Sequence, residues 1–191
     1  VVVYPGAILT IQPGVQVQFD NGTGLEIRGE LIADGTTTSQ IVFTSNNPTP
    51  TKGIWTGIQI RNQLGGKASF KWVEVFYAST AISVECCWSG GPANISNSKF
   101  TNNATALGGY AGWTMYVDNS TFINNTNAVT SADKVITNST FQANDYGLNA
   151  TERVSVCAST FTGHQKVALY GGRGTVKYST ITNNGTGVQG F

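Results

Sequence analysis

The pattern of apolar and polar positions repeats about every 20 residues in the second half of the chain. Five short phrases each end on a large apolar residue that follows Ser-Lys or Ser-Thr. They are Ile95–Phe100, Val117–Phe122, Ile136–Phe141, Val156–Phe161 and Val176–Ile181, and their closing residues are 22, 19, 20 and 20 positions apart. A fixed period of this length is typical of a solenoid, because one repeat cannot bury its apolar side alone.

Aligning the five phrases sorts their residues into columns. The closing Phe or Ile should point inward, and the period of two along a strand turns the serine two positions earlier inward as well. These serines are Ser98, Ser120, Ser139, Ser159 and Ser179. The residues beside each closing position should face outward, and in the last two repeats they form Thr-x-Thr pairs.

A second polar column lies three residues after each closing position. Its members are Asn103, Asn125, Asn144, His164 and Asn184. Because Asn tolerates left-handed backbone and its amide can bond to the next coil, we interpret this column as a stack of turn residues. His164, the one histidine of the chain, then has a turn role rather than a catalytic one.

The first 45 residues consist of short strand-like runs separated by turns. Val15–Phe19 alternates strictly between apolar and polar residues, and Asp20–Gly24 and Asp34–Gly35 have turn composition. No segment there has helical spacing. Short strands with Gly-rich turns and no amphipathic segment between them exclude a βαβ fold.

Several N-terminal segments resemble a known family. The runs Leu9–Val15, Leu25–Gly35, Ile41–Ser45 and Trp55–Ile58 resemble the opening of right-handed parallel β-helix domains of the pectate-lyase-like superfamily. They look most similar to the versions in large cell-surface and adhesion proteins, such as the Bark beetle (Anakonda) type. Later phrases such as Asn119–Asn125 resemble generic β-helix repeats. The resemblance covers nearly the whole chain and implies the fold rather than one activity.

We therefore predict an all-β fold, a right-handed parallel β-helix (solenoid) of about eight to nine coils with three faces and no substantial helix. A single β-helix should span residues 1–191, with N-terminal coils and excursion loops over 1–69 and regular repeats of about 20 residues over 70–191. Val1 opens directly in an apolar β-like run, and neither end shows a capping helix. We expect a fragment of a longer chain, or coils that stack end to end between molecules.

Charge is sparse along the chain. Charged residues make up 11% of it and the formal net charge is +1, whereas a typical soluble chain has about 25% charged residues. This balance gives no reason to expect nucleic acid or an anionic membrane surface as a partner. No apolar run approaches the roughly 20 residues that span a bilayer, so we expect no membrane insertion by this segment.

Eight Asn-x-Ser/Thr sequons favour a secreted, glycosylated eukaryotic protein at an extracellular or cell-surface location. They are Asn21, Asn94, Asn103, Asn119, Asn124, Asn138, Asn149 and Asn184. Unmodified asparagines in turns are the alternative, since the chain is rich in Asn and Thr.

The three cysteines do not suggest a simple disulfide framework. Cys157 lies about four repeats beyond Cys86 and Cys87, so stacked coils would place it roughly 19 Å away, beyond the limit of about 7 Å between disulfide Cα atoms. Cys86 and Cys87 could form a vicinal bridge, or one of them could bond a partner outside this chain. With no Cys-x-x-Cys pair and one histidine, we expect no metal and no other cofactor.

Catalysis is the alternative to a structural role. Members of the resembled superfamily that cleave polysaccharides use clustered carboxylates, either to hold Ca²⁺ or as an acid–base pair. The ten acidic residues of this chain are scattered, with no adjacent pair, so we expect no catalytic residues and no enzyme activity. Three aromatic residues near irregular segments, Trp88, Tyr110 and Trp113, are candidate contacts for sugars or protein partners.

The function most consistent with these patterns is a non-enzymatic, glycosylated structural or adhesion module of an extracellular fibre, coat or junction. Its partners should be copies of itself or neighbouring domains of the same protein, joined end to end, with glycans as further candidate partners. A carbohydrate-active or sugar-binding β-helix is the first alternative. Ice binding is the second, because flat Thr-x-Thr arrays resemble the ice-contacting faces of some β-solenoid antifreeze proteins.

Overall fold

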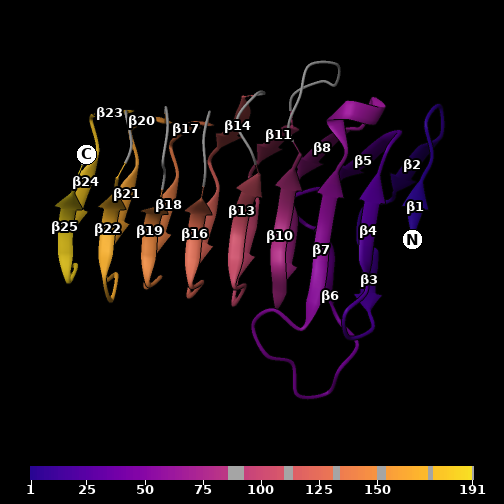
Figure 1. The fold of residues 1–191 in the computed structure, drawn as a ribbon, viewed down its shortest axis with the longest axis horizontal. Helices are drawn as coiled ribbons and strands as arrows, with labels where there is room; N and C mark the ends of the chain where they lie inside the picture. Colours follow the sequence, from indigo (N-terminus) through magenta and orange to yellow (C-terminus); the bar gives the residue numbers. More distant parts are fainter. Residues whose placement is uncertain (86–92, 110–113, 131–133, 150–153, 172–173, 191) are drawn as a thin grey trace.

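The computed structural model describes residues 1–85, 93–109, 114–130, 134–149, 154–171 and 174–190. Within these ranges the chain winds into a right-handed parallel β-solenoid whose three sheets run the length of a rod (Figure 1). Apart from η1 (Asn62–Leu64), one 3₁₀ turn, the regular structure of the described ranges is all strand. The prediction of an all-β parallel β-helix without substantial helix is confirmed. The predicted contact and disulfide positions lie outside the described residues: Cys86, Cys87, Trp88, Tyr110 and Trp113.

Each turn of the solenoid adds one parallel strand to each sheet. Sheet A consists of β1 (Val2–Val3), β4 (Gly24–Ile27), β7 (Trp55–Ile60), β10 (Ala78–Val84), β13 (Thr105–Gly109), β16 (Asn127–Thr130), β19 (Tyr146–Asn149), β22 (Val167–Tyr170) and β25 (Thr186–Gln189). Sheet B consists of β2 (Ile8–Ile11), β5 (Glu30–Asp34), β8 (Lys67–Lys71), β11 (Ala93–Ser96), β14 (Met115–Asp118), β17 (Lys134–Thr137), β20 (Val154–Cys157) and β23 (Gly174–Lys177). Sheet C consists of β3 (Gln16–Phe19), β6 (Ile41–Ser45), β9 (Val73–Phe76), β12 (Lys99–Thr101), β15 (Thr121–Ile123), β18 (Thr140–Gln142), β21 (Thr160–Thr162) and β24 (Thr180–Thr182).

Inward-facing positions build one continuous core. In sheet C the constant repeat length places four buried rings in register, and their centroids are 5.1, 4.6 and 4.4 Å apart. These rings are Phe100, Phe122, Phe141 and Phe161. In the N-terminal coils, where the spacing varies, Trp55 fills the core instead. Its ring stacks on Phe19 at 4.2 Å, and its indole N–H donates to the Phe76 carbonyl at 2.7 Å.

The serine and asparagine columns lie inside two corners of the solenoid and form hydrogen-bonded ladders. In each ladder a side-chain oxygen accepts the backbone N–H of the equivalent residue in the preceding coil. Ser139 Oγ accepts from the Ser120 N–H at 3.2 Å, and Asn125 Oδ1 accepts from the Asn103 N–H at 2.9 Å. Because buried backbone N–H groups need partners, these inward side chains make sharp corners possible inside a core. The prediction that the serines point inward is confirmed.

The asparagine column forms the ladder between coils, and the left-handed backbone falls beside this column rather than on it. The positive φ angles fall one residue earlier, at Asn102, Asn124, Ala143, Gly163 and Asn183. The serine corner has the same offset, with positive φ at Asn97, Asn119, Asn138, Ala158 and Tyr178. Each corner therefore uses two consecutive residues. The first bends the chain in the left-handed region, and the second points inward and closes the ladder.

Both ends of the described rod expose core positions. At the N-terminal end, an apolar hollow of about 620 Å³ is lined by side chains that include Leu9, Val15 and Val17, and Val15 is 39% exposed. At the other end the inward residue of β25, Val188, is 51% exposed, and Ile181 of β24 is half-buried. The rod thus presents apolar surface beside unpaired strand edges at each end of the described chain.

Candidate functional site

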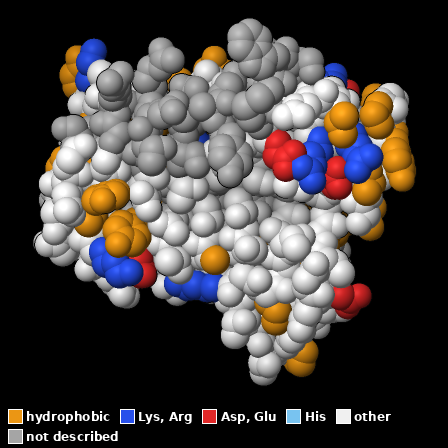
Figure 2. Space-filling model, viewed as in Figure 1, with side chains coloured by type: hydrophobic (Ala, Val, Ile, Leu, Met, Phe, Trp, Pro, Cys, Tyr) orange, Lys and Arg blue, Asp and Glu red, His pale blue; other side chains and the backbone are white. Residues whose placement is uncertain are grey.

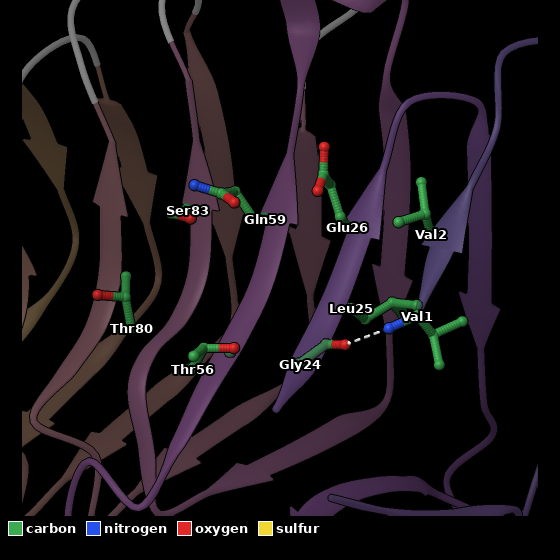
Figure 3. Close-up of a pocket in the computed structure, with 10 residues that line it drawn as sticks. Val1, Val2, Gly24, Leu25, Glu26, Thr56, Gln59, Thr80 and Ser83 are labelled. Atoms are coloured by element: carbon green, nitrogen blue, oxygen red, sulfur yellow. Dashed lines mark hydrogen bonds between the residues drawn. The ribbon is translucent and has the colours of Figure 1, made fainter. Parts of the chain in front are cut away.

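The outer face of sheet A carries a shallow trough along the rod. One hollow of about 420 Å³ crosses β1, β4, β7 and β10, and another of about 280 Å³ crosses β7, β10, β13 and β16. They share Gln59, Thr80 and Ser83, so they form one continuous surface, here called the sheet A trough (Figure 3). Hydroxyl and amide side chains line part of it, between apolar, glycine and acidic positions, and they can hydrogen-bond to a polar ligand.

Glycines keep the floor of the sheet A trough low. The pairing of β7 with β10 shifts register between Thr80 and Ile82, and Gly57 lies opposite this bulge with a φ of 109°. A Cβ on Gly57 would collide with the Thr80 carbonyl oxygen, and one on Gly108 would lie 2.9 Å from Thr80 Cγ2. At Gly57 only glycine fits this close approach of backbone to backbone, whereas at Gly108 the neighbour is the Thr80 side chain.

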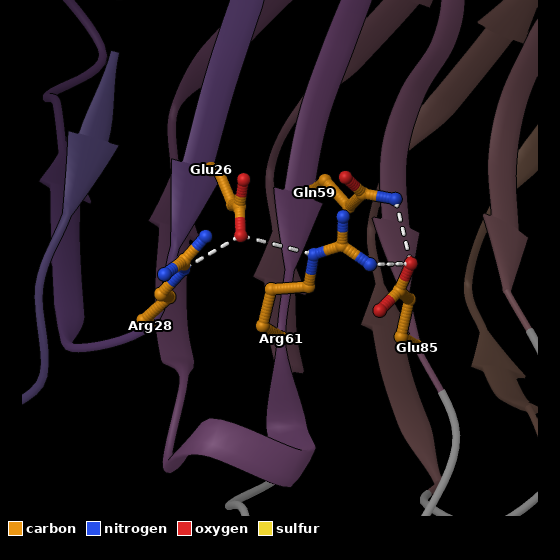
Figure 4. A network of polar contacts seen from close by, with 5 residues as sticks. All are labelled: Glu26, Arg28, Gln59, Arg61 and Glu85. Atoms are coloured by element: carbon orange, nitrogen blue, oxygen red, sulfur yellow. Dashed lines mark hydrogen bonds and ion pairs between the residues drawn. The ribbon is translucent and has the colours of Figure 1, made fainter.

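A chain of charged and amide side chains forms one wall of the trough (Figure 4). Glu26 Oε1 accepts from Arg28 Nε at 2.7 Å and from Arg61 Nε at 3.2 Å. Arg61 Nη1 also pairs with Glu85 Oε1, which accepts from Gln59 Nε2 at 2.8 Å. These contacts tie β4, β7 and β10 together across the outer surface. Figure 2 shows charged side chains gathered near the N-terminal coils on this face, and a second charged group toward the C-terminal coils.

The electrostatics of this wall oppose a general-acid role for Glu26. The hydrogen bond from Arg28, reinforced by the nearby charges of Arg28 and Arg61, holds the pKa of Glu26 below its ordinary value. The hydrogen bond and charge of Glu85 raise the pKa of Arg61. Glycoside hydrolysis needs one carboxyl group that stays protonated near neutral pH. Glu26 is held in the opposite, ionised state.

Comparisons with known proteins give no relative from which a function could be inferred, so the functional argument depends on the geometry of the structure. No family model, curated protein or solved structure matches the chain. The fold is that of a parallel β-solenoid. The likeness to pectate-lyase-like and Bark beetle (Anakonda) domains remains a likeness of repeat phrases.

Two tyrosines extend the outer face of sheet A beyond the trough. Tyr146 of β19 and Tyr170 of β22 are edge to face, with centroids 6.2 Å apart. Lys166 Nζ lies 5.0 Å from the Tyr146 ring centroid and 3.4 Å from Asp145 Oδ2. Tyr170 is exposed, so an aromatic face is available on the same sheet as the polar trough.

The predicted glycosylation positions differ in accessibility. The exposed ones are Asn21, Asn94, Asn119, Asn124 and Asn138, and the half-buried ones are Asn149 and Asn184. Asn103 is 0% exposed, and its Nδ2 donates to the Val75 carbonyl at 3.0 Å and to Asn125 Oδ1 at 3.1 Å. A sugar on that nitrogen has no room in the folded chain, so Asn103 is not an acceptor in this fold. Glycosylation at the exposed positions stays a prediction.

The remaining predicted positions lie at scattered places in the fold. The outward threonine row runs in register through Thr140, Thr160 and Thr180 on sheet C, and Cys157 is a free, half-buried cysteine of β20. Among the described residues, no group of three or more His, Cys, Asp and Glu side chains could hold a metal ion. Nor does any helix in the described ranges have the length and apolarity needed to cross a bilayer.

Sequence reasoning missed the sheet A trough because its coils are irregular. The outward row Glu26, Gln59, Ser83 and Gly108 is in register, yet successive members are 33, 24 and 25 residues apart. A period of 20 aligns none of them. The one available signal was glycine inside strand-like runs, at Gly57 and Gly108, which indicates a bulge or a close backbone approach.

Proposed function

We propose that the chain is a non-enzymatic structural module of an extracellular assembly, a rod whose ends stack on other copies of itself, head to tail, or on neighbouring domains of the same protein. The observation that carries this proposal is the match between the two ends. The column that starts at Val17 on β3 continues in register to Ile181 on β24, and the column that starts at Ile11 on β2 continues to Val176 on β23. A second copy placed beyond either end would extend the same apolar columns.

The geometry of the contact favours a filament over a closed ring. Parallel strands give the two ends different edges, so the contact joins one end of a rod to the opposite end of the next. Such heterologous contacts do not close when the molecules stack along one axis. Unpaired strand edges promote this kind of addition, and burial of the N-terminal hollow would remove apolar surface from water at about 25 cal/mol per Å².

The test is sedimentation velocity of the purified chain with one charge placed at each end. Val17→Asp should block the N-terminal end and Ile181→Asp the C-terminal end, while Gln18→Asp, on the exposed side of β3, serves as the control. The unaltered chain and the control should form oligomers whose mass grows with concentration. Each end variant alone should remain a monomer, and an equimolar mixture of the two should form dimers through the one intact junction. A monomeric unaltered chain at about millimolar concentration would refute self-assembly.

Sugar binding is the second candidate, and the sheet A trough is the observation that favours it. Its hydroxyl and amide lining and the exposed Tyr170 suit the polar edges and apolar faces of sugars. Arg28 and Arg61 already pair with carboxylates, so a neutral glycan fits better than an acidic one. Titration calorimetry with neutral oligosaccharides should give a binding signal that Gln59→Ala and Tyr170→Ala weaken. Thr175→Ala, on sheet B, should leave it unchanged. Equal heats from all variants would remove this candidate.

A further inference from the structure

His164 occupies a ladder position that asparagine fills in the neighbouring coils. Its backbone N–H donates to Asn184 Oδ1 at 2.9 Å, as the other members of the ladder donate to theirs. Its Nδ1 receives the Asn144 N–H at 3.2 Å, where an amide oxygen stands in the other coils. The imidazole is 2% exposed, so the ladder is continuous through this residue but its chemistry changes there.

The imidazole makes fewer hydrogen bonds than the asparagine it replaces. An Asn in this column also donates through Nδ2 to a backbone carbonyl, as Asn144 does to Phe122 at 3.0 Å. When Nδ1 accepts the Asn144 N–H, the ring proton must sit on Nε2. That atom is buried without a hydrogen-bond partner among the described residues.

Room for the larger ring comes from Gly147. The equivalent positions of other coils hold Ala106, Ala128 and Ala168, whereas a Cβ on Gly147 would lie 3.0 Å from His164 Nε2. A Cβ there would also collide with the Ala168 carbonyl oxygen, so the glycine leaves room for the backbone of the next coil as well as for the imidazole. The tilted Phe161 ring, with its centroid 6.2 Å from that of His164, covers another side.

Among the described residues, none of the groups found in contact with the ring carries a charge. The described groups that contact it, on the coil before (Asn144 and Gly147), on its own coil (Phe161) and on the coil after (Asn184), are uncharged. The nearby ionisable residues, Asp145 and Lys166, form an ion pair with each other on the outer surface. Burial accordingly lowers the pKa of His164, and the hydrogen bond that the ring can donate to the Asn144 carbonyl oxygen opposes the change only in part.

We propose that His164 is an acid-sensitive joint, at which protonation breaks the asparagine ladder and loosens the coils that follow it. A protonated Nδ1 cannot accept the Asn144 N–H. It lies 3.2 Å from the Asn144 carbonyl oxygen and would turn to that acceptor, leaving the N–H of Asn144 without one. In a solenoid each coil is held by its neighbours. Weakening the ladder contact between Asn144 and His164 therefore releases β20 to β25 before the coils upstream.

The sign of the pH effect follows from which state takes up the proton. A histidine whose pKa is lower in the folded chain binds its proton preferentially when the chain unfolds. The contribution of neutral His164 to stability is therefore fully present above its unfolded pKa of about 6.5. It decreases as the pH falls below that value. One proton limits the change to about tenfold per pH unit in the opening equilibrium.

Hydrogen exchange between pH 7.5 and 5 tests the proposal, with rates corrected for intrinsic exchange. The opening equilibrium of β20 to β24 should rise several-fold as the pH falls, with no comparable rise in β4 to β10. His164→Asn, which restores the residue type of the neighbouring coils, should abolish the rise. The same pH response in the variant would overturn the proposal.

A measurement on the unaltered chain checks the cause separately. Because His164 is the one histidine, its imidazole gives a single Cε1–H resonance in a proton NMR titration. That resonance should titrate below the ordinary value of about 6.5. Titration at or above that value would show that the folded chain tolerates the charge, and the proposal would fail.

Discussion

Asn125 is the residue at which the ladder can be broken most cleanly. Its Oδ1 accepts from the Asn103 N–H at 2.9 Å and from Asn103 Nδ2 at 3.1 Å. Its Nδ2 donates to the Phe100 carbonyl at 3.0 Å and to Asn144 Oδ1 at 2.9 Å. Asn125→Ala removes all four bonds and leaves the buried Asn103 N–H without its acceptor.

The expected cost follows from these losses. An orphaned buried donor costs about 1–3 kcal/mol, and each net hydrogen bond contributes roughly 1 kcal/mol. Asn125→Ala should therefore reduce the free energy of unfolding by about 2–5 kcal/mol, a large fraction of the 5–15 kcal/mol typical of a folded domain. The control is Asn124→Gly, one residue earlier. Asn124 is exposed with a φ of 52°, so glycine should cost less than about 1 kcal/mol.

Urea unfolding followed by circular dichroism measures both variants. The proteins should come from a host that does not glycosylate, since Asn124 lies in a sequon. Midpoints can be compared as stabilities only if the variants share the same m-value. If Asn125→Ala costs no more than Asn124→Gly, the ladder does not stabilise the rod as argued.

Three further predictions can be checked by urea unfolding or by peptide mapping. Phe141→Ala should cost about 3–5 kcal/mol, because it opens a cavity in the middle of the ring stack, and a cost below about 1 kcal/mol would contradict the stack. In a glycosylating host, peptide mapping after glycosidase treatment should find sugar on exposed Asn138 and none on buried Asn103, and modified Asn103 in folded protein would contradict the burial. Hydrogen bonds from Thr137 and Asn138 lower the pKa of Asp118. The contribution of ionised Asp118 to folding stability is therefore present above about pH 3.9 and is lost as the pH falls below that value. Asp118→Asn should weaken the acid dependence there, and an unchanged acid profile would show that those bonds are unimportant.

The interior of the regular coils could be predicted because the spacing is nearly constant. A constant repeat fixes register, and register alone places Phe141 between Phe122 and Phe161. At the asparagine corner the repeats indicate the turn column, but not the left-handed residue before it. Left-handed backbone and side-chain ladders are both ordinary uses of Asn, and pairs such as Asn124-Asn125 do not distinguish them. The sequence did hold the signal, since Gly163 immediately precedes His164 and glycine marks the left-handed position.

The surface of the N-terminal coils could not be predicted in this way. The register of Glu26 with Gln59 depends on an excursion between β6 and β7, and that of Gln59 with Ser83 on a bulge opposite Gly57. Neither the excursion nor the bulge has a fixed length in sequence. The ion pairs that join Arg61 to Glu26 and Glu85 follow from that register, so they too become visible only in three dimensions.

The coils within the two halves of the rod are therefore held together by different interactions, which gives a last prediction. The ladders stop at Val73 and Ala78, whose N–H groups donate to Ser98 Oγ and Asn103 Oδ1 but whose side chains accept nothing in return. Upstream of this point, the outer pairs of Arg61 link the coils instead.

Salt screens partly exposed ion pairs, and the Debye length falls from about 30 Å at 0.01 M to about 3 Å at 1 M. It does not screen hydrogen bonds inside a core. Hydrogen exchange at these two salt concentrations should therefore show faster opening of β4, β7 and β10 at high salt, by the few-fold that pairs of about 0–1 kcal/mol allow. Exchange in β15 and β18 should not change. Arg61→Met should reduce the salt response of β4, β7 and β10, where the Lys67–Glu30 pair between β8 and β5 remains, while leaving the C-terminal coils as they were. If both halves respond equally to salt, or if the response of these strands is undiminished in Arg61→Met, then the Arg61 ion pairs are not what couples the N-terminal coils.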